Sequence, residues 1–358
     1  RDTALGHSSS FMDFGEDIAN SKENIETLFN EFHLMKKKSQ ILIPLLAVVM
    51  LLSASCMRQP TDSSTSGLIT LMCDHSFENI IQQEIDVFEY TYPNANIIPY
   101  YIDAHAAIDS LLDQKTSLIV TAQELTKEQR DYLENVNKFP PRTQRIAVDA
   151  IAVIANPEND IDELSISELR DILSGKTPRW GDVFPSKLGK IQVIFDHQGS
   201  SVVKYITDSI MKGEKFTTEV YAADSVQQVF TEVQKRKNAI GLIGVSWITA
   251  DMQAQTTTIA ERMAELQKND TAMIDFTDKI KVMKIRRDNQ IEAFKPYQAY
   301  IYDGSYPLYR SIYVTTTEPN GSLSHGFYSF LTGFIGQKII LNTGVMPASV
   351  HPRLVTLN

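Results

Sequence analysis

Residues 191–206 read IQVIFDHQGSSVVKYI, which is the pattern of a strand, a polar turn and the start of a helix. The apolar residues 191–195 predict a short buried strand, and apolar residues recur at helical spacing after Ser200 and Ser201, where we expect the helix to begin. Gly199 is expected to provide the unusual backbone angles of the turn. Because the first N–H groups of a helix lack carbonyl partners, the turn and its two hydroxyls favour an anion-binding site. A serine that only caps the helix is the simpler alternative.

Two further predicted strands are followed by small hydroxyl side chains. Residues 68–73 predict a buried strand, after which Ser76 and Phe77 stand at the start of a helix. Residues 118–120 predict another strand, which ends at Thr121. Ligands of open α/β sheets bind at the carboxyl ends of the strands. We therefore expect these hydroxyls to lie at the same sheet edge as the turn described above.

A long apolar run, residues 146–155, is interrupted by Asp149. A carboxylate in such a run is costly to bury unless it is paired or close to the surface. We interpret the run as a crossing between two lobes, with Asp149 at or near the cleft, and residues 311–314 as the return crossing. An aspartate at a strand edge, without a binding role, is the alternative. The predicted fold is α/β with two lobes, each a mixed sheet flanked by helices: residues 68–150 and 311–358 form lobe 1, and residues 151–310 form lobe 2.

Local signals place several helices. Two capping boxes, which begin at Thr126 and at Ser165, predict helix starts. Gly175 is expected to end the second of these helices. One helix is expected across residues 327–341, and Trp180 is expected to cover the core of a lobe.

Residues 35–55 have the anatomy of a secretory signal: three lysines, an apolar run at residues 41–52, and small residues before Cys56. The apolar run is shorter than the roughly 20 residues of a membrane span. Cys56 resembles the acylated cysteine of a bacterial lipobox, although a serine stands where leucine is usual. We expect lipidation at Cys56, a flexible tether at residues 56–67, and a protein that faces the periplasm from a lipid anchor in a cell-envelope membrane. An uncleaved anchor with an incidental cysteine is the alternative, and residues 1–34 are expected to be an upstream, non-native extension.

Charge and reactive residues argue against several functions. The net charge of −10 disfavours a nucleic acid or an anionic membrane surface as partner. The seven histidines and two cysteines show no metal-ligand spacing, and no Gly-x-Ser-x-Gly elbow is present. We therefore expect no metal, no cofactor and no catalysis. If Cys56 carries lipid, Cys73 has no disulfide partner and is expected to be a buried strand residue.

From about residue 68 to residue 350, the chain resembles the phosphate-type (PstS-like) solute-binding proteins of ABC transporters, in a form common in Bacteroidetes lipoproteins. The resemblance rests on these segments: Asp74-His75-Ser76-Phe77, Tyr92-Pro93, residues 169–180, Gly199-Ser200-Ser201, Ala239-Ile240-Gly241-Leu242, Tyr306-Pro307-Leu308-Tyr309-Arg310, Gly336-Gln337 and residues 344–347. It implies two α/β lobes that close on an oxyanion and deliver it to an ABC permease.

The resemblance also implies ligand-binding residues. Ser76 and Phe77 match the hydroxyl and the backbone donor at the family's first helix, and Gly199, Ser200 and Ser201 match its Ser-Gly-Thr turn. These five residues are therefore expected to bind the ligand.

Other positions match the family less well. Thr121 stands where the family often has serine, Phe195 replaces its anion-gripping arginine, and Ala122 stands near the position of its proton-accepting carboxylate. We expect Asp149 to supply the carboxylate and Arg145 to supply a fork-shaped anion donor. The alternatives that remain open are Asp74 and Asp196 for the carboxylate, and Arg142 for the donor.

The function expected from the sequence is reversible capture of an inorganic oxyanion for an ABC permease, with phosphate favoured over sulfate. The alternative is a lipoprotein that kept two lobes, lost ligand binding and acts as an interaction component of an envelope assembly. The missing arginine and carboxylate motivate this alternative.

Overall fold

The computed structural model describes residues 62–217, 220–253, 258–267, 276 and 278–349. The expected extension at residues 1–34, the expected signal at residues 35–55 and the expected lipidation site at Cys56 lie outside the described residues. The described residues belong to one compact unit, Pro60–Asn358. None of the helices described in this unit is long and apolar enough to cross a bilayer.

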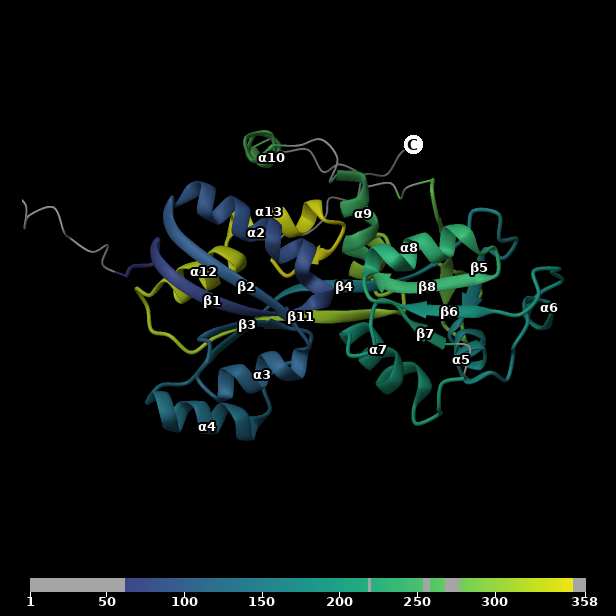
Figure 1. Ribbon diagram of the computed structural model, residues 1–358, viewed down its shortest axis with the longest axis horizontal. Coiled ribbons are helices and arrows are strands. Elements are labelled where there is room, and N and C mark those ends of the chain that lie inside the picture. The colour runs from purple at the N-terminus through teal and green to yellow at the C-terminus, as the bar shows by residue number, and fades with distance from the viewer. Residues whose placement is uncertain (1–61, 218–219, 254–257, 268–275, 277, 350–358) are drawn as a thin grey trace, which may run out of the picture. The chain divides into compact units, whose positions relative to one another are not determined.

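The structure confirms the predicted α/β class. The strands are β1 (Ser66–Asp74), β2 (Asn94–Ile102), β3 (Leu118–Thr121), β4 (Arg142–Ala155), β5 (Glu163–Ser165), β6 (Gln192–Phe195), β7 (Val220–Ala222), β8 (Ala239–Gly244), β9 (Lys281–Val282), β10 (Lys284–Arg286), β11 (Tyr309–Thr316) and β12 (Met346–Pro347). Ten of them form one sheet, in the order β2-β1-β3-β11-β4-β8-β6-β7, with β9 and β12 also paired to β4 (Figure 1). Strands β5 and β10 pair separately.

Strand β4 belongs to both halves of the sheet. Its first part pairs with β11, from Arg142 to Ala150, and its last part pairs with β8, from Ile151 to Ala155. The sheet therefore divides into two lobes that share β4, and the change of partner falls between Ala150 and Ile151, one residue after Asp149. This is the segment in which the sequence predicts a crossing.

Helices cover both faces of each half of the sheet. They are η1 (His75–Phe77), α2 (Glu78–Thr91), α3 (Ala104–Leu112), α4 (Lys127–Asn137), α5 (Ile166–Ser174), α6 (Trp180–Val183), α7 (Ser201–Tyr205), η2 (Ile206–Met211), α8 (Val226–Lys235), α9 (Val245–Gln253), α10 (Ile259–Gln267), α11 (Gln298–Tyr302), α12 (Leu323–Thr332) and α13 (Phe334–Asn342). In lobe 1, α2, α12 and α13 lie on one face of the sheet, and α3 and α4 lie on the other (Figure 1). Both predicted capping boxes form, at Thr126 and Ser165, and Gly175 ends α5 in the left-handed conformation.

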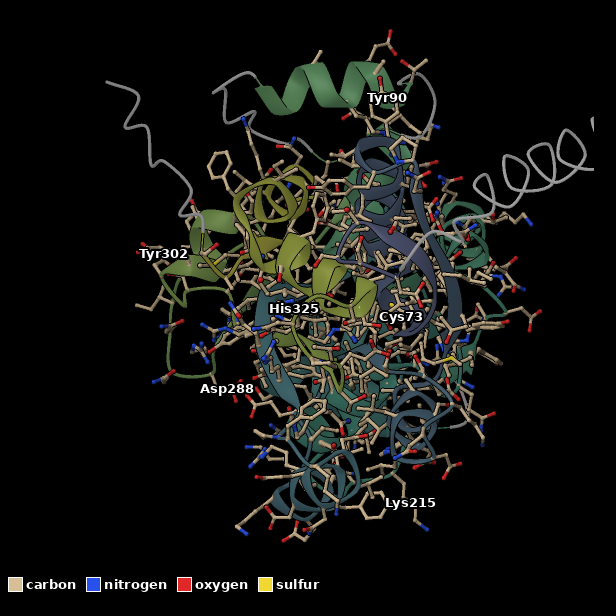
Figure 2. The ribbon with its side chains drawn as sticks, turned by 90° about the vertical axis from the view of Figure 1, so that its left-hand side faces the viewer. Cys73, Tyr90, Lys215, Asp288, Tyr302 and His325 are labelled. Carbon is tan, nitrogen blue, oxygen red and sulfur yellow. The ribbon has the colours of Figure 1, made fainter. Side chains whose placement is uncertain are left out.

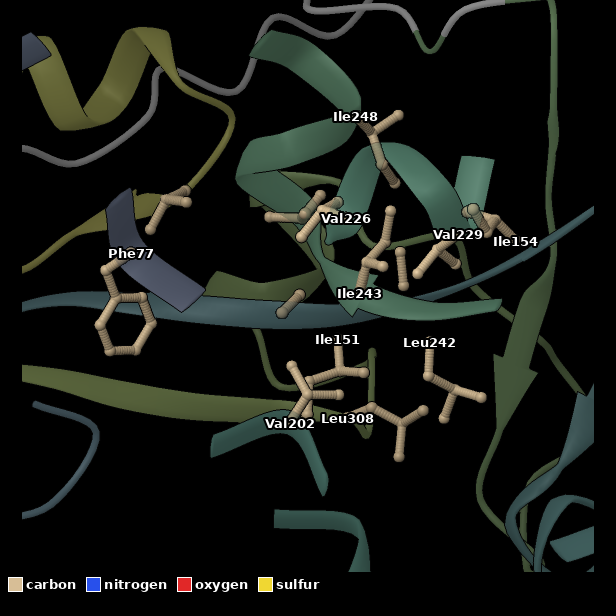
Figure 3. Packing of buried hydrophobic residues seen from close by; sticks show 14 of the residues in the cluster. Phe77, Ile151, Ile154, Val202, Val226, Val229, Leu242, Ile243, Ile248 and Leu308 are labelled. Carbon is tan, nitrogen blue, oxygen red and sulfur yellow. The ribbon is translucent and has the colours of Figure 1, made fainter. Parts of the chain in front are cut away.

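The apolar core runs through the junction of the lobes. Figure 3 shows Ile151 of β4, Leu242 of β8 and Val202 of α7 in one cluster of buried side chains. Trp180 is fully buried, as expected, and its indole N–H donates to the carbonyl of Asn238 at 3.0 Å. The core therefore fixes β4 and β8 at the boundary where a ligand site is expected.

The expected single helix over residues 327–341 is wrong, because the chain breaks at Gly333 into α12 and α13. A Cβ atom at Gly336 would lie 2.4 Å from the carbonyl oxygen of Phe330. The two helices therefore approach each other at a distance that only glycine permits. This contact is tertiary, and helical periodicity carries no sign of it.

Cys73 is a free, fully buried residue of β1, as the sequence predicts. Figure 2 shows it inside the molecule, whereas Lys215 and Tyr302 lie at the periphery. Burial, aided by the neighbouring charges of Asp74 and Glu78, raises the pKa of the Cys73 thiol well above its usual value. The thiol is therefore an inert part of the core.

Glu84 is a fully buried carboxyl group on α2, and neither of its carboxyl oxygens has a hydrogen-bond partner among the described residues. Burial raises its pKa well above the usual value. A group whose pKa is higher in the folded than in the unfolded state stabilises the fold fully below the unfolded pKa, near 4.5. That contribution is lost as the pH rises towards the folded pKa.

We therefore expect Glu84→Gln to remove a pH dependence of stability. The variant should unfold at about the same denaturant concentration as the parent at pH 5, and at a clearly higher concentration at pH 8, since each unit of pKa shift corresponds to about 1.4 kcal/mol. Urea unfolding at both pH values measures this, and Gln83→Glu on the same helix is the control. Equal midpoints for parent and variant at pH 8 would contradict a neutral, buried Glu84.

Candidate ligand-binding site

A buried ion pair lies where the two lobes meet. Arg310 of β11 stands opposite Asp149 of β4 in the antiparallel register. Its Nε and Nη2 atoms donate to Asp149 Oδ2 at 3.2 and 3.0 Å, and both side chains are almost completely buried. The guanidinium carbon lies 4.8 Å from the centre of the Phe77 ring, in a cation–π contact. The site thus contains a guanidinium group that is fixed on two sides.

Asp149 is only partly satisfied by this pair. Burial raises the pKa of its carboxyl group, and the charge of Arg310 counteracts that rise. Its Oδ1 atom is buried and makes no hydrogen bond within the described part of the chain. Asp74 shows the same feature, since its Oδ1 accepts from the backbone N–H of Ser76 at 3.0 Å while its Oδ2 is buried without a partner. Two carboxylates therefore present unused acceptor atoms next to the ion pair and the Ser76 turn.

Two hydroxyls extend from the guanidinium across the lobes. Arg310 Nη1 donates to Ser201 Oγ, and Ser201 Oγ donates to Ser76 Oγ at 3.2 Å. Ser76 follows β1 of lobe 1, whereas Ser201 begins α7 of lobe 2. Both serines are buried. A row of hydrogen-bonded polar groups therefore connects β11, which carries Arg310, to both lobes.

Ser200 and Ser201 have different roles in the structure. Ser200 Oγ accepts from the backbone N–H of Val203 at 3.1 Å, which is the N-cap arrangement. The capping alternative therefore applies to Ser200, while Ser201 faces Arg310. The neighbouring Asp196 is buried, and burial raises the pKa of its carboxyl group, against hydrogen bonding from Ser200.

Gly199 does not have the unusual backbone angles that the sequence suggested, because its φ lies outside the left-handed region. Its role is close approach. A Cβ atom there would lie 2.5 Å from Asp103 Oδ2, across the gap between the lobes. A larger residue there would push the carboxylate of Asp103 away from the turn.

Thr121 lies at the carboxyl end of β3, directly after Val120, which pairs with Cys73 of β1. Thr121 is therefore level with Asp74 on the neighbouring strand. It is buried, and its hydroxyl donates to the carbonyl of Gln123 at 2.8 Å, which leaves the hydroxyl oxygen able to accept. Ser76 and Thr121 thus lie at the carboxyl edge of the lobe 1 strands. The expectation of one shared edge is wrong for the turn after β6, because β6 runs antiparallel to β1 and β3 and its carboxyl end faces theirs from lobe 2.

The structure does not bring Arg145 to this group. Arg145 is exposed on β4 and stands opposite Tyr313, beyond the register shift that follows the Ile312–Ala147 pair, whereas Arg310 stands opposite Asp149. Arg142, the other candidate, donates to Asn320 Oδ1. Arg310 was missed as a donor, although its segment was noted for its resemblance. The available signal was that Arg310 directly precedes the predicted return crossing, while Asp149 interrupts the first predicted crossing.

Further contacts close the lobes over this region. Trp247, just after β8, donates its indole N–H to the carbonyl of Ser76 at 3.1 Å. Ser246 donates to Asn79 Oδ1 at 3.2 Å. These hydrogen bonds join the start of α9 in lobe 2 to the start of α2 in lobe 1. The described site is therefore in a closed arrangement.

A family model for the PBP superfamily domain matches residues 59–335, which is most of the chain. The chain belongs to the PBP superfamily. One curated relative is the phosphate-binding protein PstS of Staphylococcus saprophyticus, which is 27% identical to this chain over 189 residues. The match covers 52% of this chain and 50% of the relative. The PstS protein of Staphylococcus aureus strain USA300 is 27% identical over 178 residues, covering 49% and 45%. The chain thus spans about half the length of the curated relatives it matches.

Solved structures show the same fold. A phosphate ABC transporter substrate-binding protein from Clostridium perfringens, crystallised with bound phosphate, superposes with a TM-score of 0.61 at 18% identity, covering 79% of this chain and all of that one. An ABC-type phosphate transport receptor from Vibrio cholerae gives a TM-score of 0.56 at 17% identity, covering 78% and 100%. The predicted two-lobed periplasmic-binding-protein fold is therefore confirmed.

Proposed function

We propose that this chain captures an inorganic oxyanion, phosphate in the first place, and delivers it to an ABC permease. The proposal is carried by the buried chain Arg310–Ser201–Ser76, which joins a fixed guanidinium to hydroxyls of both lobes. A guanidinium fork binds tetrahedral oxyanions with charge-assisted hydrogen bonds. An anion that takes the place of the direct serine contact would hold the two lobes together.

The unused carboxylate oxygens favour phosphate over sulfate. Asp149 Oδ1 and Asp74 Oδ2 can only accept hydrogen bonds while ionised. Hydrogen phosphate carries a proton at neutral pH and can donate it in a hydrogen bond to one of them, whereas sulfate carries no proton and would be repelled. The chemistry of the group therefore selects an anion that is also a donor.

The transport role rests on more than the site. The curated relatives named above are phosphate-binding PstS proteins, and the family is one of extracytoplasmic substrate-binding proteins. We include in the proposal the signal peptide at residues 35–55, the lipid on Cys56, the tether at residues 56–67 and the periplasm-facing location. Capture is reversible and makes or breaks no covalent bond. The lobes are proposed to divide at the crossings near residues 150 and 311.

A thermal-shift screen of phosphate, sulfate, molybdate and small organic phosphates tests the proposal. We expect phosphate to raise the unfolding temperature most, because a ligand that binds only the folded state stabilises it. The absence of a shift with any oxyanion, together with a cleft filled by side chains, would favour the alternative of a ligand-free envelope component.

Changing Ser200 and Ser201 together to alanine should weaken phosphate binding by at least tenfold in calorimetry. A hydrogen bond to a charged group contributes about 1.5–3 kcal/mol, and about 1.4 kcal/mol is tenfold in affinity. The single changes should separate the two roles: Ser201→Ala lowers the affinity, and Ser200→Ala mainly lowers stability through the lost cap, by about 1 kcal/mol. Ser225→Ala, which removes the N-cap of α8, is the matched control. Unchanged phosphate affinity in the double variant would remove this turn from the site.

A further inference from the structure

A second group of residues, all of them potential metal ligands, lies between the lobes and does not include Arg310, Ser201 or Ser76. His75 follows β1, Asp103 directly precedes α3, and His197 follows β6. One ligand atom of each residue lies within 4.8 Å of the other two. His75 and Asp103 belong to lobe 1 and His197 belongs to lobe 2. The sequence predicted no metal ligands because these three residues come from separate segments.

His197 is oriented in a way that leaves one ring nitrogen available. Its Nδ1 atom lies 3.8 Å from Oδ2 of the buried Asp196. Its Nε2 atom is buried, lies 3.4 Å from Asp103 Oδ1, and makes no hydrogen bond within the described residues. The Asp196 contact is too long for a hydrogen bond, whereas the buried Nε2 atom lies beside the Asp103 carboxylate without a hydrogen bond, so Nε2 is the nitrogen placed to bind a metal ion.

The separations between the three residues suit a small metal ion. The rings of His75 and His197 meet edge to face, with centroids 4.8 Å apart and planes at 76°. Ligand atoms around a tetrahedral zinc ion, with bonds of about 2.0–2.1 Å, are about 3.3 Å apart. The Asp103–His197 pair already has about that spacing, and the ligand atom of His75 lies within 4.8 Å of both. Two imidazole nitrogens and one carboxylate oxygen, with water in the fourth position, are a common zinc donor set.

We infer that His75, Asp103 and His197 bind Zn²⁺ and that the ion bridges the two lobes at the edge of the ligand site. The contact of Gly199 with Asp103 supports the bridging role, because the turn that carries His197 lies directly against lobe 1. A bound ion adds bonds that exist only while the lobes are together. Zinc should therefore favour the closed arrangement and slow the release of the captured anion, a consequence that rests on the proposed function.

Calorimetric titration of the full chain with Zn²⁺ alone, without any oxyanion, tests the site. We expect one ion per chain, at least tenfold weaker binding in His197→Ala and in Asp103→Asn, and unchanged binding in His325→Ala, which alters a histidine on α12. Co²⁺ should give the visible absorption of a tetrahedral complex, and His75→Ala should abolish it. Mg²⁺, which prefers six oxygen ligands, should not compete. If the parent binds no zinc, or if His197→Ala binds it as the parent does, the inference is wrong.

A second measurement separates this inference from the proposed function. The dissociation rate of phosphate is measured with and without one equivalent of Zn²⁺, and we expect the ion to slow release in the parent and not in His197→Ala. If zinc binds and phosphate does not, the proposed function fails and the metal site stands. If phosphate binds and zinc does not, the metal site alone fails. Zinc binding with an unchanged phosphate release rate would overturn the bridging role.

Discussion

Replacing Arg310 with alanine is expected to reduce phosphate affinity by at least a hundredfold and to destabilise the folded chain. In the proposed site the guanidinium is the cationic donor, held by Asp149, Ser201 and the Phe77 ring. Each charged hydrogen bond to the anion that is lost costs about 1.5–3 kcal/mol. Removing one partner of a buried ion pair costs about 3–5 kcal/mol, because the other charge stays buried without compensation. Calorimetry with phosphate and urea unfolding measure the two effects separately.

The double variant Arg310→Ala/Asp149→Ala provides the control. It should recover part of the lost stability, because no uncompensated carboxylate remains, and it should not recover phosphate binding. The pH dependence gives a further check. Burial raises the pKa of Asp149, so without Arg310 the carboxyl group is protonated more readily in the folded state. The single variant should therefore lose least stability at low pH and more as the pH rises. An Arg310→Ala variant that keeps the parent's affinity and stability would refute the site.

Replacing Trp180 with alanine should cost about 3–5 kcal/mol of folding free energy, the range for deleting a large buried aromatic side chain. Trp180 is fully buried in lobe 2, and its indole N–H bonds the carbonyl of Asn238. The alanine variant loses the ring's contacts and leaves that carbonyl without its donor. Urea unfolding of the parent and the variant measures the difference.

Trp180→Phe is the matched control for that experiment, since it keeps most of the apolar volume and loses only the hydrogen bond. It should cost clearly less than the alanine change. Neither variant should alter phosphate affinity under conditions where it is folded, because Trp180 makes no contact with Arg310 or Ser201 in the described structure. A cost below about 1 kcal/mol for Trp180→Ala would show that the region repacks without it.

Much of the fold follows from rules that act over a few residues. The two capping boxes form because Thr126 and Ser165 bond backbone groups three positions away, and Gly175 ends α5 through its own φ of 79°. The buried strand ends at Ser76 and Thr121 are marked by apolar runs followed by polar turns. Such signals need no knowledge of the partner segments, and the sequence contains all of them.

The features that sequence reasoning missed depend on contacts between distant segments. Arg310 meets Asp149 only because the antiparallel register of β11 and β4 sets them opposite each other. Gly199 serves a contact with Asp103 of the other lobe, and Gly336 serves a contact with Phe330. Apolar periodicity describes one segment at a time, so it indicates that a residue lies in a strand or a turn and not which residue it faces.

The hydrogen-bonded pairing of β4 with β11 at the boundary of the lobes limits how the clamshell can move. Two hydrogen-bonded strands resist twisting more than two unpaired segments do. They bend most easily about an axis that lies in the plane of the sheet and runs across both strands. Arg310 and Asp149 stand at that boundary, facing each other across the ribbon. Arg310 and Asp149 are therefore displaced least when the two lobes open, whereas Ser76 moves with lobe 1 and Ser201 moves with lobe 2. Under the proposed function, the base of the binding site is therefore formed before the anion binds, and closure of the lobes brings Ser76 and Ser201 to it.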